Sequence, residues 1–179
     1  TYSEESKEAD FVASDIRYVS QPDFVGTEFH ISGKYDMEVR LGIPGLFNVV
    51  NALAAVSVCS FLGLDQARIS HALENIRVNG RMEIVYTSER CTVLVDYAHN
   101  AVSMESLLST LRDYKPKRLV CVFGCGGNRS KDRRYSMGEI GGKMADLSII
   151  TADNSRYEKV EDIIADIRGS IEKTGGKFI

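Results

Sequence analysis

The first part of the chain carries apolar residues at every second position, which is the pattern of half-buried strands. Phe24–Ile31 and Tyr35–Leu41 both alternate in this way, and Ser32-Gly33-Lys34 separates them. Two alternating runs around a short glycine-containing loop are typical of a β-hairpin. Phe11–Tyr18 is mixed but also favours strand, and Ile43-Pro44-Gly45 ends the strand region.

Two helices are expected next. Leu46–Leu62 is apolar nearly all round, so it is predicted to be a buried helix that stops at Gly63. Asp65 is then expected to cap a second helix through its carboxylate. The apolar face of that helix would carry Ile69, Ala72, Leu73 and Ile76.

After Gly80 the pattern changes to short apolar strands that alternate with amphipathic helices. The expected strands are Cys91–Val95, Arg118–Phe123 and Leu147–Thr151. Three helices are expected. The first is capped by Asn100 and carries an apolar face of Met104, Leu107, Leu108 and Leu111; the second lies around Ser136–Met144. The third carries an apolar face of Val160, Ile163, Ile164, Ile167 and Ile171. This alternation predicts βαβ units and a parallel sheet.

A linker at Arg77–Gly80 separates the two patterns, so the expected domains are residues 1–79 and residues 80–179. The final segment, Gly176–Ile179, resembles the opening of a further strand. We therefore expect the second domain to be truncated.

The composition is that of an ordinary globular protein, with 44% hydrophobic and 26% charged residues. The formal net charge of -3 leaves no basic surplus to neutralise phosphates, so a nucleic-acid partner is not expected. No apolar run approaches the roughly 20 residues that span a bilayer, so no membrane association is expected. The cysteines lack the spacing of a zinc site and are expected to be free thiols in a reducing cytoplasm: Cys59, Cys91, Cys121 and Cys125.

Three polar loops follow the predicted strands of the second domain. In an open parallel sheet, ligands bind beyond the carboxyl ends of the strands. The first loop holds Asp96, Tyr97 and His99. A carboxylate there can accept hydrogen bonds from sugar hydroxyls and Tyr97 can stack on a flat ring; alternatively, Asp96 and His99 only cap the following helix.

The second and third loops are rich in groups that bind anions. Gly124–Arg134 combines glycines, which permit close backbone approach to a ligand, with four basic residues at a helix N-terminus. It predicts a carboxylate or phosphate ligand, or is merely a solvated basic loop. Asp153–Arg156 ends in an arginine suited to bidentate carboxylate binding, or is an ordinary turn. The chain contains no P-loop motif and no paired metal-ligand spacing.

In their order along the chain, these residues resemble the Mur ligase family. The resemblance rests on five segments: Ile43–Ala55, Gly80–Glu83, Asp96–His99, Phe123–Arg129 and Asp153–Arg156. It implies an α/β fold in which residues 1–79 are the C-terminal piece of a P-loop-type ATPase domain. Residues 80–179 would then be a truncated Rossmann-like domain with a mostly parallel sheet.

The resemblance also implies an activity. The family joins an amino acid to a nucleotide-linked peptide carboxylate, using ATP and Mg²⁺, through an acyl phosphate. The matching members add meso-diaminopimelate to UDP-MurNAc-L-Ala-D-Glu in peptidoglycan synthesis. We therefore expect a monomeric ligase of the bacterial cytoplasm that acts on small molecules. Its P-loop and magnesium ligands are expected upstream of Thr1, so this chain alone is expected to be inactive.

The roles of individual residues are implied by the same resemblance. Asn51 would contact the adenine of ATP. Arg81 would reach the ATP phosphates and is the expected catalytic residue. Asp96 would hold the ribose, with Tyr97 and His99 nearby.

The incoming amino acid would be bound by Arg129 together with Asp153, Asn154, Ser155 and Arg156. Members that use meso-diaminopimelate carry an arginine at the position of Arg156, which pairs with the extra carboxylate. The chain departs from the usual family pattern at three positions. Ser155 and Ala101 stand where proline is usual, and Asn128 stands where aspartate is usual.

Two other interpretations stay open. A lysine-adding Mur member or a folylpolyglutamate-type ligase shares the Asp-x-x-His region, but should lack the pairing of Arg129 with Asn154–Arg156. A stand-alone module that binds an amino acid or a nucleotide is the alternative from another class. A reading frame that truly begins at Thr1, with no ATPase before it, would favour that module.

Overall fold

The computed structural model describes all residues, 1–179, and contains two compact units, Thr1–Tyr97 and Ala98–Ile179. The first unit opens with a four-stranded sheet whose spatial order follows the chain. Its strands are β1 (Tyr2–Ser3), β2 (Phe11–Ser20), β3 (Val25–Gly33) and β4 (Met37–Leu41). β2 pairs antiparallel with β3 and β3 with β4, while β1 runs parallel to β2. The predicted hairpin is thus confirmed as β3–β4.

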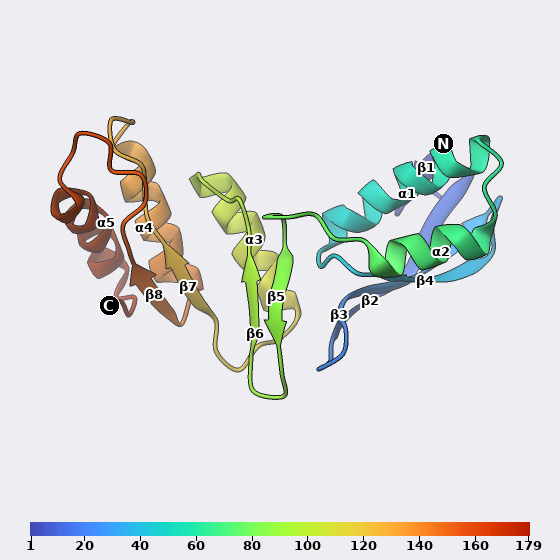
Figure 1. Ribbon diagram of the computed structural model, residues 1–179, viewed down its shortest axis with the longest axis horizontal. Helices are drawn as coiled ribbons and strands as arrows, with labels where there is room; N and C mark the ends of the chain where they lie inside the picture. The colour runs from blue at the N-terminus through green and yellow to red at the C-terminus, as the bar shows by residue number, and fades with distance from the viewer. The chain divides into compact units, whose positions relative to one another are not determined.

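Two helices, α1 (Leu46–Phe61) and α2 (Gln66–Asn75), pack on this sheet (Figure 1). The predicted cap of α2 is confirmed, because the carboxylate of Asp65 accepts a 2.9 Å hydrogen bond from the N–H of Arg68. The core joins one face of the sheet to one stripe of each helix, and includes Phe29, Ile31, Val39, Leu41, Val49, Leu53, Ile69 and Leu73.

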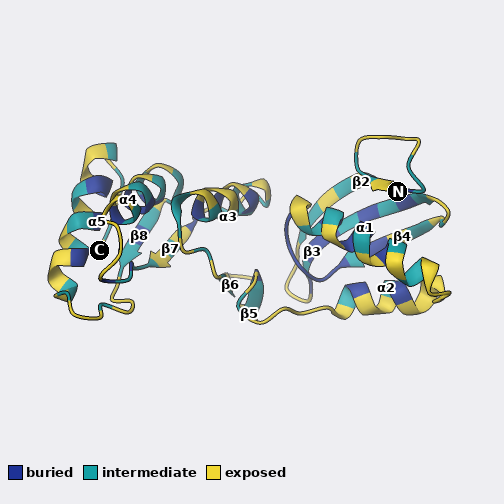
Figure 2. Ribbon diagram, turned by 90° about the horizontal axis from the view of Figure 1, so that it is seen from above, coloured by how far each residue is buried: buried dark blue, intermediate teal, exposed yellow.

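The prediction that the first helix is buried all round is wrong. Only Val49, Ala52, Leu53 and Val56 of α1 are buried. Phe61 is 90% exposed, and Val58 is also exposed. Figure 2 shows exposed and intermediate residues on α1 beside its buried ones. A helix that packs on a single sheet buries only one stripe, and apolar residues on its other sides do not change that geometry. Ala72 and Ile76 of the predicted α2 face are likewise exposed.

A hairpin of β5 (Glu83–Thr87) and β6 (Thr92–Val95) completes the first unit. The sequence pattern indicated β6 but not β5, and it placed β6 in the parallel sheet. β6 pairs instead with β5, because the turn between them brings the two runs together; Ser88 N–H donates to Cys91 O at 2.9 Å. The chain divides into its two compact units after Tyr97, whereas the sequence placed the domain boundary between residues 79 and 80. That boundary stays a prediction.

The second unit is a β-α-β arrangement with helices packed beside it. β7 (Val120–Phe123) and β8 (Leu147–Ile150) are parallel neighbours joined through α4 (Asp132–Met144). α3 (Ala101–Asp113) and α5 (Val160–Thr174) pack against α4 (Figure 1). Both helices contribute residues to the apolar core of the second unit. Phe178 forms a parallel bridge with Ser148, so the expected opening of another strand is confirmed.

The α/β class is confirmed, with parallel pairing of β7 and β8 in the second unit and mostly antiparallel pairing in the first. The predicted Asn100 cap is also present: its side chain accepts from Ser103 N–H at 2.9 Å in a reciprocal capping box. None of the helices is both long enough and apolar enough to cross a membrane.

Candidate functional site

Two of the three polar loops leave the same edge of the second unit. Gly124 follows β7 and Thr151 follows β8, and these strands are parallel neighbours. Thr151 N–H donates a 3.0 Å hydrogen bond to Phe123 O, so the strands stay paired up to the point where the loops begin. The expected convergence of the second and third loops at one sheet edge is therefore present.

Hydrogen bonds join the two loops to each other. Gly127 N–H donates to Asn154 O at 2.8 Å. Tyr157 N–H donates to Asn128 Oδ1 at 3.1 Å, and Asn128 N–H donates to a carboxylate oxygen of Glu158. The loops consequently form one structure rather than two independent surface segments.

The glycines of the first of these loops make room for the second. A Cβ on Gly127 would lie 1.9 Å from Ser155 O, and a Cβ on Gly124 would lie 2.3 Å from Thr151 O. Both distances are far below van der Waals contact, so no larger residue fits without displacing backbone. The glycines were expected to admit a ligand; what they admit in the structure is the neighbouring loop.

The two arginines of the predicted amino-acid site flank the joined backbone. Arg129 follows Asn128, and Arg156 precedes Tyr157, so each is adjacent to a residue in the inter-loop hydrogen bonds. Both arginine side chains are exposed and neither forms an ion pair. Asn128 and Arg156 both have φ of 51°, a left-handed conformation that is uncommon outside glycine.

The other basic residues of the glycine loop are held differently. Arg134, at 1% exposure, donates to both carboxylate oxygens of Glu158 at 2.7 Å and to Asp166 at 2.9 Å. Lys131 lies 3.3 Å from Asp166. The expectation of four basic residues that concentrate positive charge is therefore wrong for these two, because acidic partners from the following segments neutralise them.

These ion pairs set the ionisation of the acidic groups. The pKa of Glu158 is lowered, chiefly by the hydrogen bond from Arg134 and then by that from Asn128 N–H. Desolvation raises the pKa of Asp166, but hydrogen bonds from Arg134 and Lys131 outweigh it, and the net shift is downward. From the sequence, Arg134 was counted only as one of four basic residues, and Glu158 was not singled out. The apolar Met137, three residues after Arg134 on the same helix, could have indicated that Arg134 is buried.

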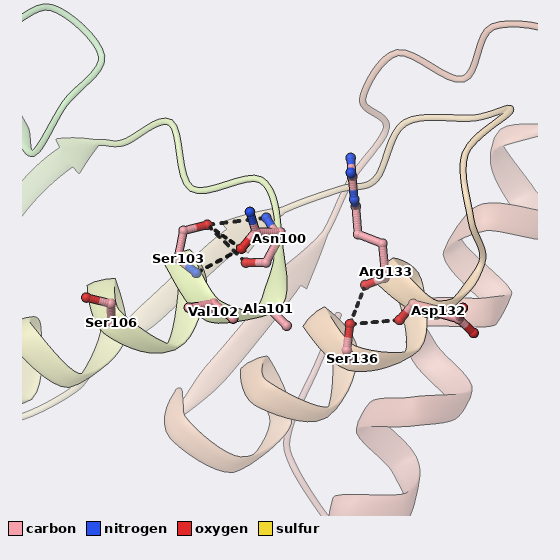
Figure 3. Close-up of a pocket in the computed structure, with 8 residues that line it drawn as sticks. All are labelled: Asn100, Ala101, Val102, Ser103, Ser106, Asp132, Arg133 and Ser136. Carbon is pink, nitrogen blue, oxygen red and sulfur yellow. Dashed lines mark hydrogen bonds between the residues drawn. The ribbon is translucent and has the colours of Figure 1, made fainter.

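A hollow lies between the N-terminal turns of α3 and α4 within the second unit (Figure 3). Asn100 and Ser103 line one side, while Asp132, Arg133 and Ser136 line the other. Ser136 Oγ donates to the Asp132 carbonyl at 2.7 Å, and the Arg133 side chain extends away from that pair (Figure 3). Exposed helix N-termini and a guanidinium make this side of the unit favourable to anions.

Three of the predicted nucleotide-binding residues lie together at the base of the β5–β6 hairpin. The guanidinium carbon of Arg81 is 4.7 Å from the centroid of the Tyr97 ring, within the range of a cation–π contact. Asp96 Oδ2 accepts a 2.9 Å hydrogen bond from the N–H of Met82. Backbone and ring contacts thus hold Arg81, Asp96 and Tyr97 in one cluster.

The other two predicted nucleotide-binding residues form other contacts. Asn51 is exposed on α1 and donates to Asn48 Oδ1 at 3.2 Å. His99 belongs to the second unit, where its N–H donates to Ser103 Oγ at 3.3 Å. The expectation that the Asp96 loop shares a sheet edge with the other two loops is wrong, because β6 pairs only with β5.

A family model, described as the Mur ligase, glutamate ligase domain, matches residues 80–177. The chain belongs to the Mur ligase family. The matched range begins at the residue before Arg81 and contains both joined loops. Of the predicted site residues, Asn51 alone lies outside it.

Individual Mur ligases resemble the chain over nearly all its length. It is 40% identical to the UDP-N-acetylmuramoyl-L-alanyl-D-glutamate--2,6-diaminopimelate ligase of Alkaliphilus oremlandii, over 97% of the chain and 35% of that protein. The enzyme of the same name from Clostridioides difficile is 39% identical over the same shares. The chain therefore spans about a third of the length of the curated relatives that it matches.

Solved structures agree in fold. A UDP-N-acetylmuramoyl-L-alanyl-D-glutamate--2,6-diaminopimelate ligase superposes with a TM-score of 0.72 at 30% identity, over 99% of this chain and 36% of that chain. A folylpolyglutamate synthase from Thermotoga maritima superposes with a TM-score of 0.74 at 22% identity, over 95% of this chain and 39% of that one. At that identity the second likeness shows the shared fold alone.

Proposed function

We propose that this chain is part of an ATP-dependent ligase that adds meso-diaminopimelate to UDP-MurNAc-L-Ala-D-Glu in the bacterial cytoplasm. The relatives that match 97% of the chain carry the name of that ligase. The observation that carries the proposal is the hydrogen-bonded pair of loops, which presents two exposed arginines, Arg129 and Arg156, beside one rigid backbone.

The amino-acid site is proposed to lie on these loops. Arg129, Asp153, Asn154, Ser155 and Arg156 would bind meso-diaminopimelate. A guanidinium binds a carboxylate through two parallel hydrogen bonds, and meso-diaminopimelate has a second carboxylate that lysine lacks. Arg156 would pair with that group and repel the ammonium of lysine. The inter-loop hydrogen bonds support this role because they limit where Arg156 can reach.

The nucleotide is proposed to use the Arg81 cluster. Arg81 would contact the ATP phosphates, Asp96 would accept hydrogen bonds from the ribose, and Tyr97 would offer a ring face. Tyr97 is 61% exposed, which suits stacking on a flat base or sugar. Asn51 and His99 would complete the nucleotide contacts from α1 and from the cap of α3.

The chemistry is a two-step amide synthesis. The D-glutamyl carboxylate first takes the γ-phosphoryl group of ATP, which releases ADP. The amine of the incoming amino acid then attacks the acyl phosphate, forms the amide and expels phosphate. Positive charge from Arg81 would stabilise the phosphoryl oxygens in the first step.

Magnesium accompanies ATP in this proposal, and none of residues 1–179 is proposed as its ligand. They contain no group of three or more His, Cys, Asp or Glu side chains placed to hold a metal ion. Two acidic residues near the loops, Glu158 and Asp166, form ion pairs with Arg134 and Lys131. No step is therefore assigned to the metal on this chain.

The test is phosphate release by the full-length protein that contains this chain. ATP, magnesium and UDP-MurNAc-L-Ala-D-Glu would be present throughout, with meso-diaminopimelate or L-lysine as the variable. Release that requires meso-diaminopimelate is the expected result. Release with lysine alone would reassign the amino acid, and release with neither would overturn the proposal in favour of a different ligase or a binding module.

A further inference from the structure

The most deeply buried charged side chain in the protein is not among the residues proposed to bind the amino acid. Arg134, on the first turn of α4, is 1% exposed. Charged side chains are seldom buried to this degree unless they are paired. Arg134 meets Glu158 through two hydrogen bonds and Asp166 through one, and its pKa is raised chiefly by the bond to Glu158.

Glu158 connects this buried arginine to both loops. Its carboxylate accepts the N–H of Asn128, the residue before Arg129. Its own N–H donates to Ser155 O at 3.0 Å, which closes the turn that contains Arg156. Glu158 therefore bonds to the residue before Arg129 through its carboxylate, and closes the turn that contains Arg156 through its backbone N–H.

Stability alone does not account for this arrangement. A buried ion pair often contributes little net stability, because desolvation offsets the attraction. The Nε of Arg134 is buried without a hydrogen-bond partner, which adds a further cost. The unit already has an apolar core, which includes Met104 and Leu108 of α3 and Ile167 and Ile171 of α5.

What the ion pair does fix is an unfavourable backbone. Asn128 and Arg156 are both left-handed, at φ 51°, and neither is glycine. Such residues persist only where surrounding contacts hold them. The Glu158 carboxylate holds Asn128 directly, and the backbone N–H of Glu158 holds the turn around Arg156 by donating to Ser155 O.

We propose that Arg134 and Glu158 form a latch that positions Arg129 and Arg156 for the carboxylates of the incoming amino acid, without touching the substrate themselves. The proposal rests on the function proposed above and identifies two positioning residues for it. Arg134 holds the Glu158 carboxylate in place, Glu158 holds the two loops, and the loops aim the two exposed guanidinium groups.

The latch predicts a selective kinetic defect. In the full-length protein, Arg134→Lys and Glu158→Gln keep side-chain size but lose the bidentate charged pair. The KM for meso-diaminopimelate should rise about tenfold or more in either variant, because small misplacements of binding groups are costly. The KM for ATP should stay within roughly twofold, since neither residue is among those proposed to bind the nucleotide.

A double variant and a matched control sharpen the test. Arg134→Lys combined with Glu158→Gln should be no worse than the more affected single variant, because both changes break the same latch. Arg168→Lys is the control: Arg168 also pairs with a glutamate, Glu172, in the same unit, but it is 60% exposed on α5 and lies outside both loops. Its KM values should not change.

Hydrogen exchange gives a readout that does not depend on substrate. The peptide covering residues 124–131 should exchange faster in Arg134→Lys than in the wild type, while the melting temperature changes little. An unchanged KM for meso-diaminopimelate together with unchanged exchange would overturn the latch. Equal rises in both KM values, or a defect that tracks a fall in melting temperature, would also overturn it in favour of a purely structural ion pair.

The two proposals fail in different ways. If the wild-type protein releases no phosphate with meso-diaminopimelate, the proposed function fails, and the substrate side of the latch fails with it. If the wild type is active but Arg134→Lys and Glu158→Gln have unchanged KM values, like the Arg168→Lys control, the proposed function stands and the latch alone is refuted.

Discussion

Gly127 donates its backbone N–H to the carbonyl oxygen of Asn154 at 2.8 Å, which ties the glycine loop to the Asp153–Arg156 loop. The two residues are far apart along the chain and meet because β7 and β8 are parallel neighbours. The carboxyl ends of both strands therefore deliver their loops to one place. The proposed amino-acid site depends on this contact.

Gly127→Ala should separate the loops. The new Cβ would lie 1.9 Å from Ser155 O, so backbone must move. We expect a loss of about 1–3 kcal/mol in the free energy of unfolding, the usual range for overpacking. Diaminopimelate-dependent phosphate release should fall as well. Urea unfolding and steady-state kinetics measure the two effects.

Gly169→Ala is the control for that substitution. Gly169 lies in α5, and a Cβ added there would meet open space, with no neighbouring atom within 4 Å. Replacing a helical glycine by alanine should stabilise the protein by about 0.5–1 kcal/mol and leave activity unchanged. Equal effects of Gly127→Ala and Gly169→Ala would contradict the close approach of the two loops.

Arg81→Ala should act on the nucleotide rather than on the amino acid. Removing a charge-assisted contact to phosphate should raise the KM for ATP roughly tenfold or more and lower kcat. The KM for meso-diaminopimelate should change little. Arg90→Ala, in the turn of the same β5–β6 hairpin, is the control, and kinetics that match Arg81→Ala would refute a specific role for Arg81.

The cysteines should differ in reactivity. Burial raises the pKa of the Cys121 thiol to about 11 and that of the Cys125 thiol to about 11, so little thiolate forms at pH 8. Cys91 is exposed. Iodoacetamide at pH 8 should label Cys91 well before Cys121 or Cys125, as read by peptide mass spectrometry. Labelling of Cys125 first would contradict its burial beside Met137.

Asp146 should contribute to acid sensitivity. Its pKa is lowered from 3.8, chiefly by the hydrogen bond from Arg112 and then by that from Leu119 N–H. A carboxyl group with a depressed folded-state pKa stabilises the protein above 3.8 and loses that contribution as pH falls through the lower folded-state pKa. Asp146→Asn should therefore be less stable at pH 6, and should lose less stability than the wild type as the pH falls below about 4.

Asp113→Asn is the matched control for the acid limb. Asp113 ends α3 in the same unit, is exposed and forms no ion pair. Its replacement should leave the pH dependence of urea unfolding unchanged. If Asp146→Asn and wild type lose stability in parallel below pH 4, the ion pair with Arg112 is not the cause.

Local patterns predicted local structure well. Alternation around Ser32-Gly33-Lys34 indicated the β3–β4 hairpin, and Asp65 and Asn100 cap their helices as expected. These features depend on side chains and backbone within a few residues of each other. The sequence therefore contains nearly all of the physical cause.

Features that depend on distant neighbours were harder to predict. The apolar character of α1 does not reveal that only one sheet covers it, so Phe61 was wrongly expected to be buried. β6 pairs with β5, and β5 was hard to predict because its apolar pattern is weak. Arg134 looked like one basic residue among four, because Glu158 and Asp166 approach it only after folding.

Arg156 should set the choice between amino acids, if the joined loops present this guanidinium to the second carboxylate of meso-diaminopimelate. The measurement is kcat/KM for meso-diaminopimelate and for L-lysine in the full-length protein, in wild type, Arg156→Ala and the control Arg168→Ala. We predict that the ratio of the two values falls by about tenfold or more in Arg156→Ala alone, the cost of one charged pair. An unchanged ratio in an active Arg156→Ala protein would contradict the proposed role of Arg156 and of the loops that carry it.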